Sequence, residues 1–250
     1  MPTQDFTGTT ALVTGASRGF GRAVATALAQ AGAHVVAVAR TRGQLEELQA
    51  KVGDNITPVV ADVADPVVAG QLIGKYNPRT LVLNAGASPL ARPLHLQTWE
   101  TFSRNWEVDV RHVFNWSREA LLRPLEPGST VVAFSSAAAV AGSPLSGGYA
   151  GAKGTIKFIS AYAAAESASA SLGIRFVAVL PKLSPATELG ANGAAAYAAR
   201  LGIDVGAFIA QMGPELTTEQ VGKTIVDLAR HEEFDQAAYI LGPDGLNPLG

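Results

Sequence analysis

Short apolar runs alternate with longer stretches of helical periodicity along the whole chain. Runs of this kind are typical of strands buried on both faces of a parallel sheet. We predict strands at residues 10–14, 34–39, 56–61, 80–83, 130–135, 174–180 and 238–241. We predict helices from the turn at 15–21 to about residue 31, and at 44–51, 65–75, 98–123, 149–172 and 217–230. Residues 182–213 are rich in Ala and Gly, and we expect helical patches and no strand there.

Strands that alternate with helices predict an α/β fold with a doubly wound parallel sheet and helices on both faces. Neither a linker nor a charge block divides the chain, so we expect residues 1–250 to form a single domain. Polar residues and turn formers follow several predicted strands directly, namely Gly15, Asp62, Asn84, Ser136 and Pro181. Sheets of this type bind ligands at the carboxyl ends of their strands. These residues are therefore expected to converge on one rim.

Composition narrows the functional classes. The chain is 48% hydrophobic and 16% charged, with a formal net charge of −2 and no cysteine. This balance gives no reason to expect a nucleic acid or an anionic membrane as a partner. The four histidines show no metal-ligand spacing, and the first ten residues show no signal peptide. We expect a cytoplasmic protein without a metal site.

The turn at residues 14–21 follows a predicted strand and opens a helix, with glycines at Gly15, Gly19 and Gly21. Glycines let the backbone approach a pyrophosphate, and a helix N-terminus supplies N–H donors and partial positive charge. A glycine-rich turn alone can be merely a tight connection. The order of strand, turn, helix and second strand favours a dinucleotide site.

The end of the second predicted strand indicates which dinucleotide binds. An NAD site places an acid there to hold the ribose 2′-hydroxyl. This chain instead has Arg40 and Arg42, with Arg18 in the glycine-rich turn. Guanidinium groups suit a 2′-phosphate, so we expect NADP(H) rather than NAD(H). The alternative is that Arg40 and Arg42 are solvated turn residues.

Tyr149 and Lys153 are four residues apart on a predicted helix, with Ser136 upstream at the end of a strand. Positions i and i+4 share one helix face. An ammonium beside a phenol favours the phenolate and so prepares a general acid/base. The pair alone is a weak signal, because an Ala-rich helix can carry it on its surface.

Together these motifs resemble the short-chain dehydrogenase/reductase family, in its short single-domain branch, over residues 10–245. The resemblance implies a Rossmann-like domain of three α/β/α layers and an NADP(H)-dependent oxidoreductase that interconverts a carbonyl and an alcohol. It implies that Tyr149 transfers the proton, Ser136 holds the substrate carbonyl and Lys153 binds the nicotinamide ribose. It also implies a homodimer or homotetramer formed through the helices at 98–124 and 149–172. The cofactor contacts that it implies, with Tyr149 and Lys153, are Gly15, Ser17, Arg18, Gly19, Phe20, Gly21, Arg40, Asp62, Val63, Asn84, Ala85, Gly86 and Pro181.

One departure from the family pattern is Asp109, where relatives commonly have an Asn that anchors a water for proton relay. We keep Asp109 among the catalytic candidates and expect it to pair with Lys153. Its negative charge opposes phenolate formation at Tyr149, so we expect an alkaline-shifted pH optimum relative to Asp109→Asn. We expect Asn105 to be an exposed polar position, with compensation for Asp109 as the alternative.

A second departure is Lys182, where the family usually has Gly after the sixth strand. It either meets a phosphate or an acidic substrate, or it points to solvent. Residues 183–213, which we term the lid segment, are expected to cover the substrate. The expected pocket walls are mainly apolar, namely Pro89, Leu90, Leu94, Ala138, Val140, Leu145, Leu183 and Leu189. The alternative for these residues is ordinary packing under the lid segment. The substrate is thus expected to be a small, mainly apolar carbonyl or alcohol.

The competing hypothesis is an NADP(H)-binding sensor or scaffold of the same fold whose catalysis is reduced or lost. Asp109 and Lys182 favour it, and the intact set of Ser136, Tyr149 and Lys153 argues against it.

Overall fold

The computed structural model describes residues 6–249, and in these residues eight strands form one sheet. The strands are β1 (Thr10–Thr14), β2 (His34–Ala39), β3 (Ile56–Val60), β4 (Thr80–Leu83), β5 (Thr130–Phe134), β6 (Arg175–Pro181), β7 (Ala238–Gly242) and β8 (Gly245–Pro248). The α-helices are α1 (Gly19–Gln30), α2 (Arg42–Val52), α3 (Pro66–Tyr76), α4 (Trp99–Asn105), α5 (Arg111–Leu122), α6 (Ala138–Ala141), α7 (Gly147–Ser169), α8 (Glu188–Leu201), α9 (Val205–Gln211) and α10 (Thr218–Arg230). A 3₁₀ turn, η1 (Leu94–Leu96), and a π-helix, η2 (Trp106–Val110), complete these elements.

The strand order is β3-β2-β1-β4-β5-β6-β7-β8, with β1 to β7 parallel and β8 antiparallel to β7. The order reverses between β1 and β4, and ligands bind beside such a reversal in doubly wound sheets. The predicted Rossmann-like, doubly wound fold is confirmed, with one antiparallel strand added at its edge.

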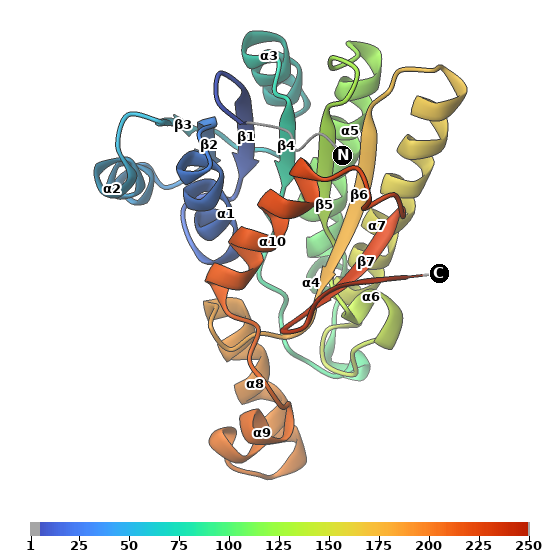
Figure 1. Ribbon diagram of the computed structural model, residues 1–250. Helices are drawn as coiled ribbons and strands as arrows, with labels where there is room; N and C mark the ends of the chain where they lie inside the picture. Colours follow the sequence, from blue (N-terminus) through green and yellow to red (C-terminus); the bar gives the residue numbers. More distant parts are fainter. Residues whose placement is uncertain (1–5, 250) are drawn as a thin grey trace.

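Side chains of neighbouring strand residues enter opposite layers of the core, because successive strand residues point to opposite faces. Val13 belongs to the cluster that contains residues of α1, α2 and α10, whereas Leu12 belongs to the cluster formed with α3, α5 and α7. Figure 1 shows α1 and α10 side by side on one face and α5 and α7 on the other. The helices thus cover both faces, as a three-layer fold requires.

The predicted helical segment over residues 98–123 is confirmed in its extent, because α4, η2 and α5 follow one another without a gap, but its middle is a π-helix rather than an α-helix. The segment begins as α4, capped by the Thr98 hydroxyl, which accepts from Thr101 N at 3.2 Å. It then continues as η2 before becoming α5. Hydrophobic periodicity hardly distinguishes an α-helix with a π segment from a regular one. Such segments are frequent at functional sites, and this one carries Asp109 into the interior.

Two elements, the strand β8 and the short helix α6, were not predicted from the sequence. β8 forms a hairpin with β7 across Pro243 and Asp244, and Gly245 supplies the positive φ of +100° that the turn requires. The short α6 follows β5. The expectation of helices without a strand in the lid segment is confirmed, because α8 and α9 fill most of it.

The helices α8 and α9 lie beyond the carboxyl ends of the strands, at the bottom of Figure 1. Among residues 6–249, no single helix has the length and apolar composition of a membrane span. Only α8 and α9 taken together reach that composition, and they are bent by 104° at their junction.

Candidate active site

The glycine-rich turn between β1 and α1 packs tightly against the loop that follows β4. Gly15 has a φ of +68°, and a Cβ there would lie 2.8 Å from both Ala85 Cα and Asn84 Nδ2. A Cβ on Gly21 would overlap the carbonyl oxygen of Gly15. No side chain larger than glycine fits at either position without moving these loops.

Thr14 ties the two loops together. Its hydroxyl donates to Val82 O at 3.1 Å and accepts from the amides of Asn84 and Ala85 at 2.9 and 3.2 Å. The Asn84 side-chain amide donates to Thr14 O at 3.2 Å. The sequence placed Thr14 in the glycine-rich turn but did not reveal that its hydroxyl joins the two loops.

The start of α1 is suited to an anion. Its N-cap, Arg18, makes no side-chain capping hydrogen bond, and the first turn contains no acid. The first amides of a helix lack partners within the helix, so an oxyanion can accept from them. Ser17 and Gly19 flank Arg18 in the same turn, and Phe20 packs against Phe134 with ring centres 6.4 Å apart. The residues present therefore fit a cofactor pyrophosphate.

The remaining expected cofactor residues lie where the strands end. Arg40 follows β2 directly and is exposed. Asp62 is exposed after β3 and caps its own turn by accepting from Ala64 N at 3.0 Å. Val63 is buried, and its carbonyl accepts from Trp116 Nε1 at 2.9 Å. Pro181 ends β6, and its carbonyl accepts from Ala137 N at 3.0 Å.

Tyr149 and Lys153 are one turn apart on α7, and Lys153 Nζ lies 5.5 Å from the centre of the Tyr149 ring. Two contacts to the end of β5 fix this lysine. Its Nζ donates to Phe134 O at 3.0 Å, and the Ser135 hydroxyl donates to Lys153 O at 2.7 Å. Ser136 follows next in the chain, half-buried, and its hydroxyl accepts from Ala138 N at 3.2 Å. The ends of β5 and α7 thus hold Ser136 and Lys153 in one framework.

The Asp109 carboxylate pairs with Lys153, with Oδ2 3.2 Å from Nζ and both side chains almost completely buried. Its other oxygen, Oδ1, accepts from Ala87 N at 2.7 Å. A Cβ on Gly86 would lie 2.7 Å from Asp109 Oδ2, so the loop after β4 closes directly over the carboxylate. Burial lowers the pKa of Lys153, but Asp109 and Tyr149 outweigh it, so the pKa of Lys153 is raised. Lys153 is therefore a fixed cation.

The expectation of an exposed Asn105 is wrong. Its side chain is only 2% exposed and donates to Ala87 O at 2.7 Å. The same amide is 3.5 Å from each Asp109 oxygen, which is the limit for a hydrogen bond. Asn105, the last residue of α4, therefore supports the loop after β4 that holds Asp109.

His112, which the sequence did not single out as a site residue, is completely buried beside this group. Within residues 6–249, neither ring nitrogen has a hydrogen-bond partner. The ring meets Trp116 edge-on, with centroids 5.9 Å apart. Burial first, and the positive charge of Lys153 second, lower the pKa of His112 to about 3. The backbone of Ala85 acts in the opposite direction without reaching hydrogen-bond geometry, so the imidazole is neutral at physiological pH.

The two remaining candidate cations lie at the edge of the site. Arg18 is exposed, and its guanidinium pairs with Glu188 in the first turn of α8. Lys182 is also exposed, and its aliphatic chain runs beside Gly242. The pKa of Asp244 is lowered mainly by hydrogen bonds from the local backbone and from Asn247, and the charge of Lys182 makes a smaller contribution in the same direction. Lys182 thus points toward the β7–β8 turn.

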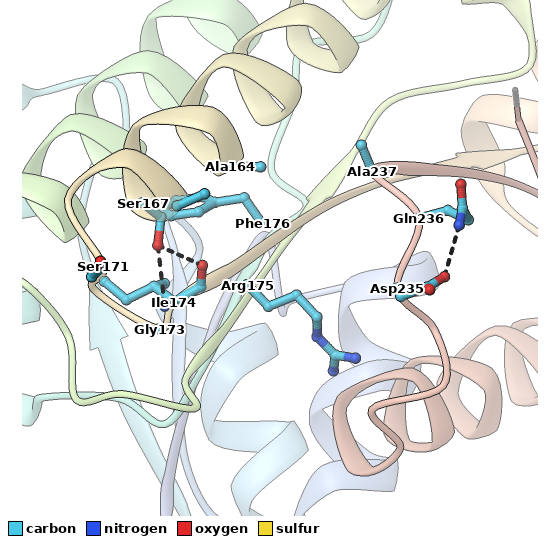
Figure 2. A pocket seen from close by; sticks show the side chains of 11 residues that line it. Ala164, Ser167, Ser171, Gly173, Ile174, Arg175, Phe176, Asp235, Gln236 and Ala237 are labelled. Carbon is cyan, nitrogen blue, oxygen red and sulfur yellow. Dashed lines mark hydrogen bonds between the residues drawn. The ribbon is translucent and has the colours of Figure 1, made fainter.

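A pocket of about 520 Å³ lies at the opposite end of the sheet, beside the start of β6 (Figure 2). Four of its polar side chains already have partners in the fold. Ser167 Oγ donates to Ile174 O at 2.8 Å, and Gln236 donates to Asp235. The Arg175 guanidinium reaches the last carbonyls of α10, including Leu228 O at 2.6 Å. This pocket is distant from the strand carboxyl ends and contains none of the expected site residues.

Comparison with known proteins identifies the family. A family model described as short chain dehydrogenase matches residues 9–198. Carbonyl reductase [NADPH] 2 from Sus scrofa is 38% identical over 130 residues, 51% of this chain and 53% of that protein. L-xylulose reductase from Homo sapiens is 38% identical over 107 residues, 43% of each chain. The chain thus spans about half the length of the curated relatives it matches.

Solved structures resemble the chain over nearly its whole length. A 3-ketoacyl-(acyl-carrier-protein) reductase from Brucella melitensis, complexed with NADH, has a TM-score of 0.78 and 25% identity, and the match covers 94% of this chain and 97% of that one. A protein from Beutenbergia cavernae with bound NADP, described as an NAD(P) dependent gluconate 5-dehydrogenase, has the same TM-score of 0.78 and 25% identity, with 95% and 96% covered. On the family match and these relatives, the chain belongs to the short-chain dehydrogenase/reductase family.

Proposed function

We propose that this protein is an NADP(H)-dependent oxidoreductase that interconverts a carbonyl and an alcohol. The observation that carries the proposal is the placement of Tyr149 beside the buried, fixed cation of Lys153. A nearby positive charge stabilises the phenolate that forms when Tyr149 gives up its proton. The relatives named as carbonyl and xylulose reductases support the reaction class.

In the proposed mechanism the bound nicotinamide supplies or accepts the hydride. Tyr149 donates a proton from its hydroxyl to the carbonyl oxygen during reduction and takes it back during oxidation. The Ser136 hydroxyl donates a hydrogen bond to the same oxygen and orients it. Lys153 holds the cofactor ribose and stabilises the Tyr149 oxyanion. Asp109 holds Lys153 in place through the 3.2 Å ion pair.

The preference for NADP(H) rests on Arg40 and Arg18. Arg40 is exposed directly after β2, where an NAD site would have an acid. Guanidinium groups recognise phosphate through paired, charge-assisted hydrogen bonds. The relative named carbonyl reductase [NADPH] 2 supports this preference.

We propose a small, mainly apolar carbonyl or alcohol as the substrate, bound beneath the lid segment. Several expected wall residues are large, apolar and exposed, as a substrate surface requires: Leu94, Val140 and Leu189. The continuous sheet supports one domain for residues 1–250, with residues 183–213 as the lid. Exposed aromatic side chains on η2, α5 and α7 support a homodimer or homotetramer: Trp106, Phe114, Phe158 and Tyr162.

The test is NADPH consumption with a panel of aldehydes, ketones and ketoses, comparing the wild type with Tyr149→Phe. We expect the wild type to turn over a member of the panel and the variant to lose that turnover. The variant is expected to retain NADPH binding, which is measured by the quenching of tryptophan fluorescence. Equal turnover in both proteins would remove Tyr149 from the mechanism.

The sensor hypothesis is the second candidate, because Asp109 offsets the charge of Lys153. It predicts tight NADPH binding without turnover of any carbonyl in the panel. The same experiment therefore separates the two functions.

A further inference from the structure

The first turn of the lid segment contacts the glycine-rich turn. The Arg18 guanidinium pairs with the Glu188 carboxylate, which joins the start of α1 to the start of α8. A Cβ on Gly19 would lie 3.7 Å from the Thr187 methyl group, which is ordinary van der Waals contact. The lid segment thus lies against the loop that we assign to the cofactor phosphates.

A second polar contact holds α8 farther along. The Tyr197 hydroxyl hydrogen-bonds to the Ser143 hydroxyl, which also accepts from Ser146 N at 3.0 Å. Ser143 belongs to the connection between Ser136 and Tyr149. The helix α8 therefore contacts both the glycine-rich turn and the connection between Ser136 and Tyr149. The Arg18–Glu188 ion pair is the contact on the side of the glycine-rich turn.

The first turn of α8 holds the Glu188 carboxylate in place. Thr187 caps α8 by accepting from Gly190 N at 3.0 Å, which fixes the first turn. A carboxylate in the first turn is stabilised by the partial positive charge of the helix N-terminus. The Arg18 side chain does not cap α1, and within residues 6–249 its guanidinium pairs with Glu188.

We propose that Glu188 is a cofactor-specificity residue whose carboxylate competes with the 2′-phosphate of NADP(H) for Arg18. This inference deepens the proposed function and rests on it. In this proposal NADP(H) displaces Glu188 when it engages Arg18, because the carboxylate and the 2′-phosphate are both negatively charged and repel each other. NAD(H) has no phosphate at that position and leaves the pair intact. Glu188 therefore reduces the preference for NADP(H) without affecting NAD(H).

The experiment measures the dissociation constants of NADPH and NADH by fluorescence quenching for the wild type and Glu188→Gln. The pair is more than half exposed, and exposed ion pairs contribute little. We therefore expect Glu188→Gln to tighten NADPH binding about two- to fivefold and to leave NADH unchanged. Glu215→Gln is the matched control, since Glu215 is exposed beside the lid segment and forms no ion pair within residues 6–249.

The same substitution in an Arg18→Gln background isolates the pair. In that background we expect Glu188→Gln to have no effect on NADPH binding, because the Arg18 guanidinium for which the two anions compete is absent. Weaker NADPH binding in Glu188→Gln would mean that Arg18 bridges lid and cofactor, and would overturn the proposal. An equal gain for NADH, or a gain that survives without Arg18, would also overturn it. Failure of the wild type to bind NADPH would instead refute the proposed function.

Discussion

Asp109 and Lys153 form a buried ion pair that the main chain holds from two sides. Asp109 Oδ1 accepts from Ala87 N at 2.7 Å, while Lys153 Nζ donates to Phe134 O at 3.0 Å and lies 3.2 Å from Asp109 Oδ2. The pair therefore joins the ends of β4 and β5 through side chains from η2 and α7. It has consequences for stability and for the pH dependence of catalysis.

Removal of the cation alone is expected to destabilise the fold strongly. Lys153→Met leaves the Asp109 carboxylate buried and unpaired, which lowers the free energy of unfolding by about 3–5 kcal/mol. Adding Asp109→Leu to that variant removes the unpaired charge and is expected to recover most of the loss. Urea denaturation of the three proteins measures both steps.

An exposed pair serves as the control for that experiment. Arg111 lies 3.9 Å from Glu107, and both side chains are more than half exposed. Arg111→Met is expected to change stability by less than about 1 kcal/mol. A Lys153→Met variant no less stable than this control would contradict the structural role of the ion pair.

Asp109 is also expected to set the pH at which the enzyme works. Its negative charge opposes the positive field of Lys153 at Tyr149, so the phenolate forms less readily. Asp109→Asn is expected to move the ascending limb of the pH–rate profile for alcohol oxidation to lower pH. The direction follows from the charge alone, because removing a negative charge close to Lys153 leaves more of its positive field to act on Tyr149.

Glu107→Gln makes the same change of charge on the same helical segment, at an exposed position. Its pH–rate profile is expected to match that of the wild type. An Asp109→Asn profile that does not move would refute the electrostatic role of Asp109.

His112 is expected to make the fold sensitive to acid. Its pKa is lowered from an ordinary 6.5 to about 3 by burial and by Lys153, so below pH 6.5 the unfolded chain takes up a proton that the folded chain does not. The free energy of unfolding therefore falls as the pH falls from 6.5 toward 3. At pH 4.5 this contribution is about 3 kcal/mol.

Urea denaturation at pH 7 and pH 4.5 measures this effect. His112→Leu is expected to lose about 3 kcal/mol less than the wild type between the two pH values. His95→Leu, at an exposed site on η1, is expected to lose as much as the wild type. Equal losses in all three proteins would show that His112 does not govern acid stability.

Hydrophobic patterning was sufficient to predict the fold, because the strands from β1 to β7 are short and mainly apolar, and β3 kept enough apolar residues to be predicted although it contains Thr57 and Pro58. It did not reveal η2, since a π segment adds one residue without a Gly or Pro to mark it. β8 was missed for a different reason. Its signal, Pro243-Asp244-Gly245, is a recognised turn sequence, but the strand after it is short and only partly apolar.

The positions of site residues could be predicted from the sequence where those residues belong to a motif. They could not be predicted where burial or pairing depends on contacts between distant segments that no motif brings together. The pairing of Asp109 with Lys153 followed from opposite charges that the motifs place at one site. The burial of Asn105 at the end of α4 and of His112 at the start of α5 depends on tertiary packing, so their polar side chains gave no sign of it. The Arg18–Glu188 contact joins residues 170 positions apart in sequence, and local pattern cannot show it.

The aromatic surface on α7 is expected to form the contact between subunits. Phe158 and Tyr162 are 68% and 61% exposed, with ring centres 6.4 Å apart. Phe158→Ser combined with Tyr162→Ser is expected to lower the molar mass measured by light scattering toward that of a single chain. Val67→Ser, at an equally exposed position on α3, is expected to leave the mass unchanged. A double variant with the wild-type mass would exclude this face as the interface.

Arg40 is expected to determine most of the preference for NADP(H). It is exposed directly after β2, and a charge-assisted hydrogen bond to phosphate contributes about 1.5–3 kcal/mol. Arg40→Gln is therefore expected to raise the dissociation constant of NADPH about 10- to 100-fold and to leave that of NADH within about twofold. Arg118→Gln, an exposed arginine on α5 paired with Glu119, is the control and is expected to change neither constant. If Arg40→Gln weakens both cofactors equally, Arg40 stabilises the loop rather than reading the 2′-phosphate, and the cofactor assignment then depends on Arg18 alone.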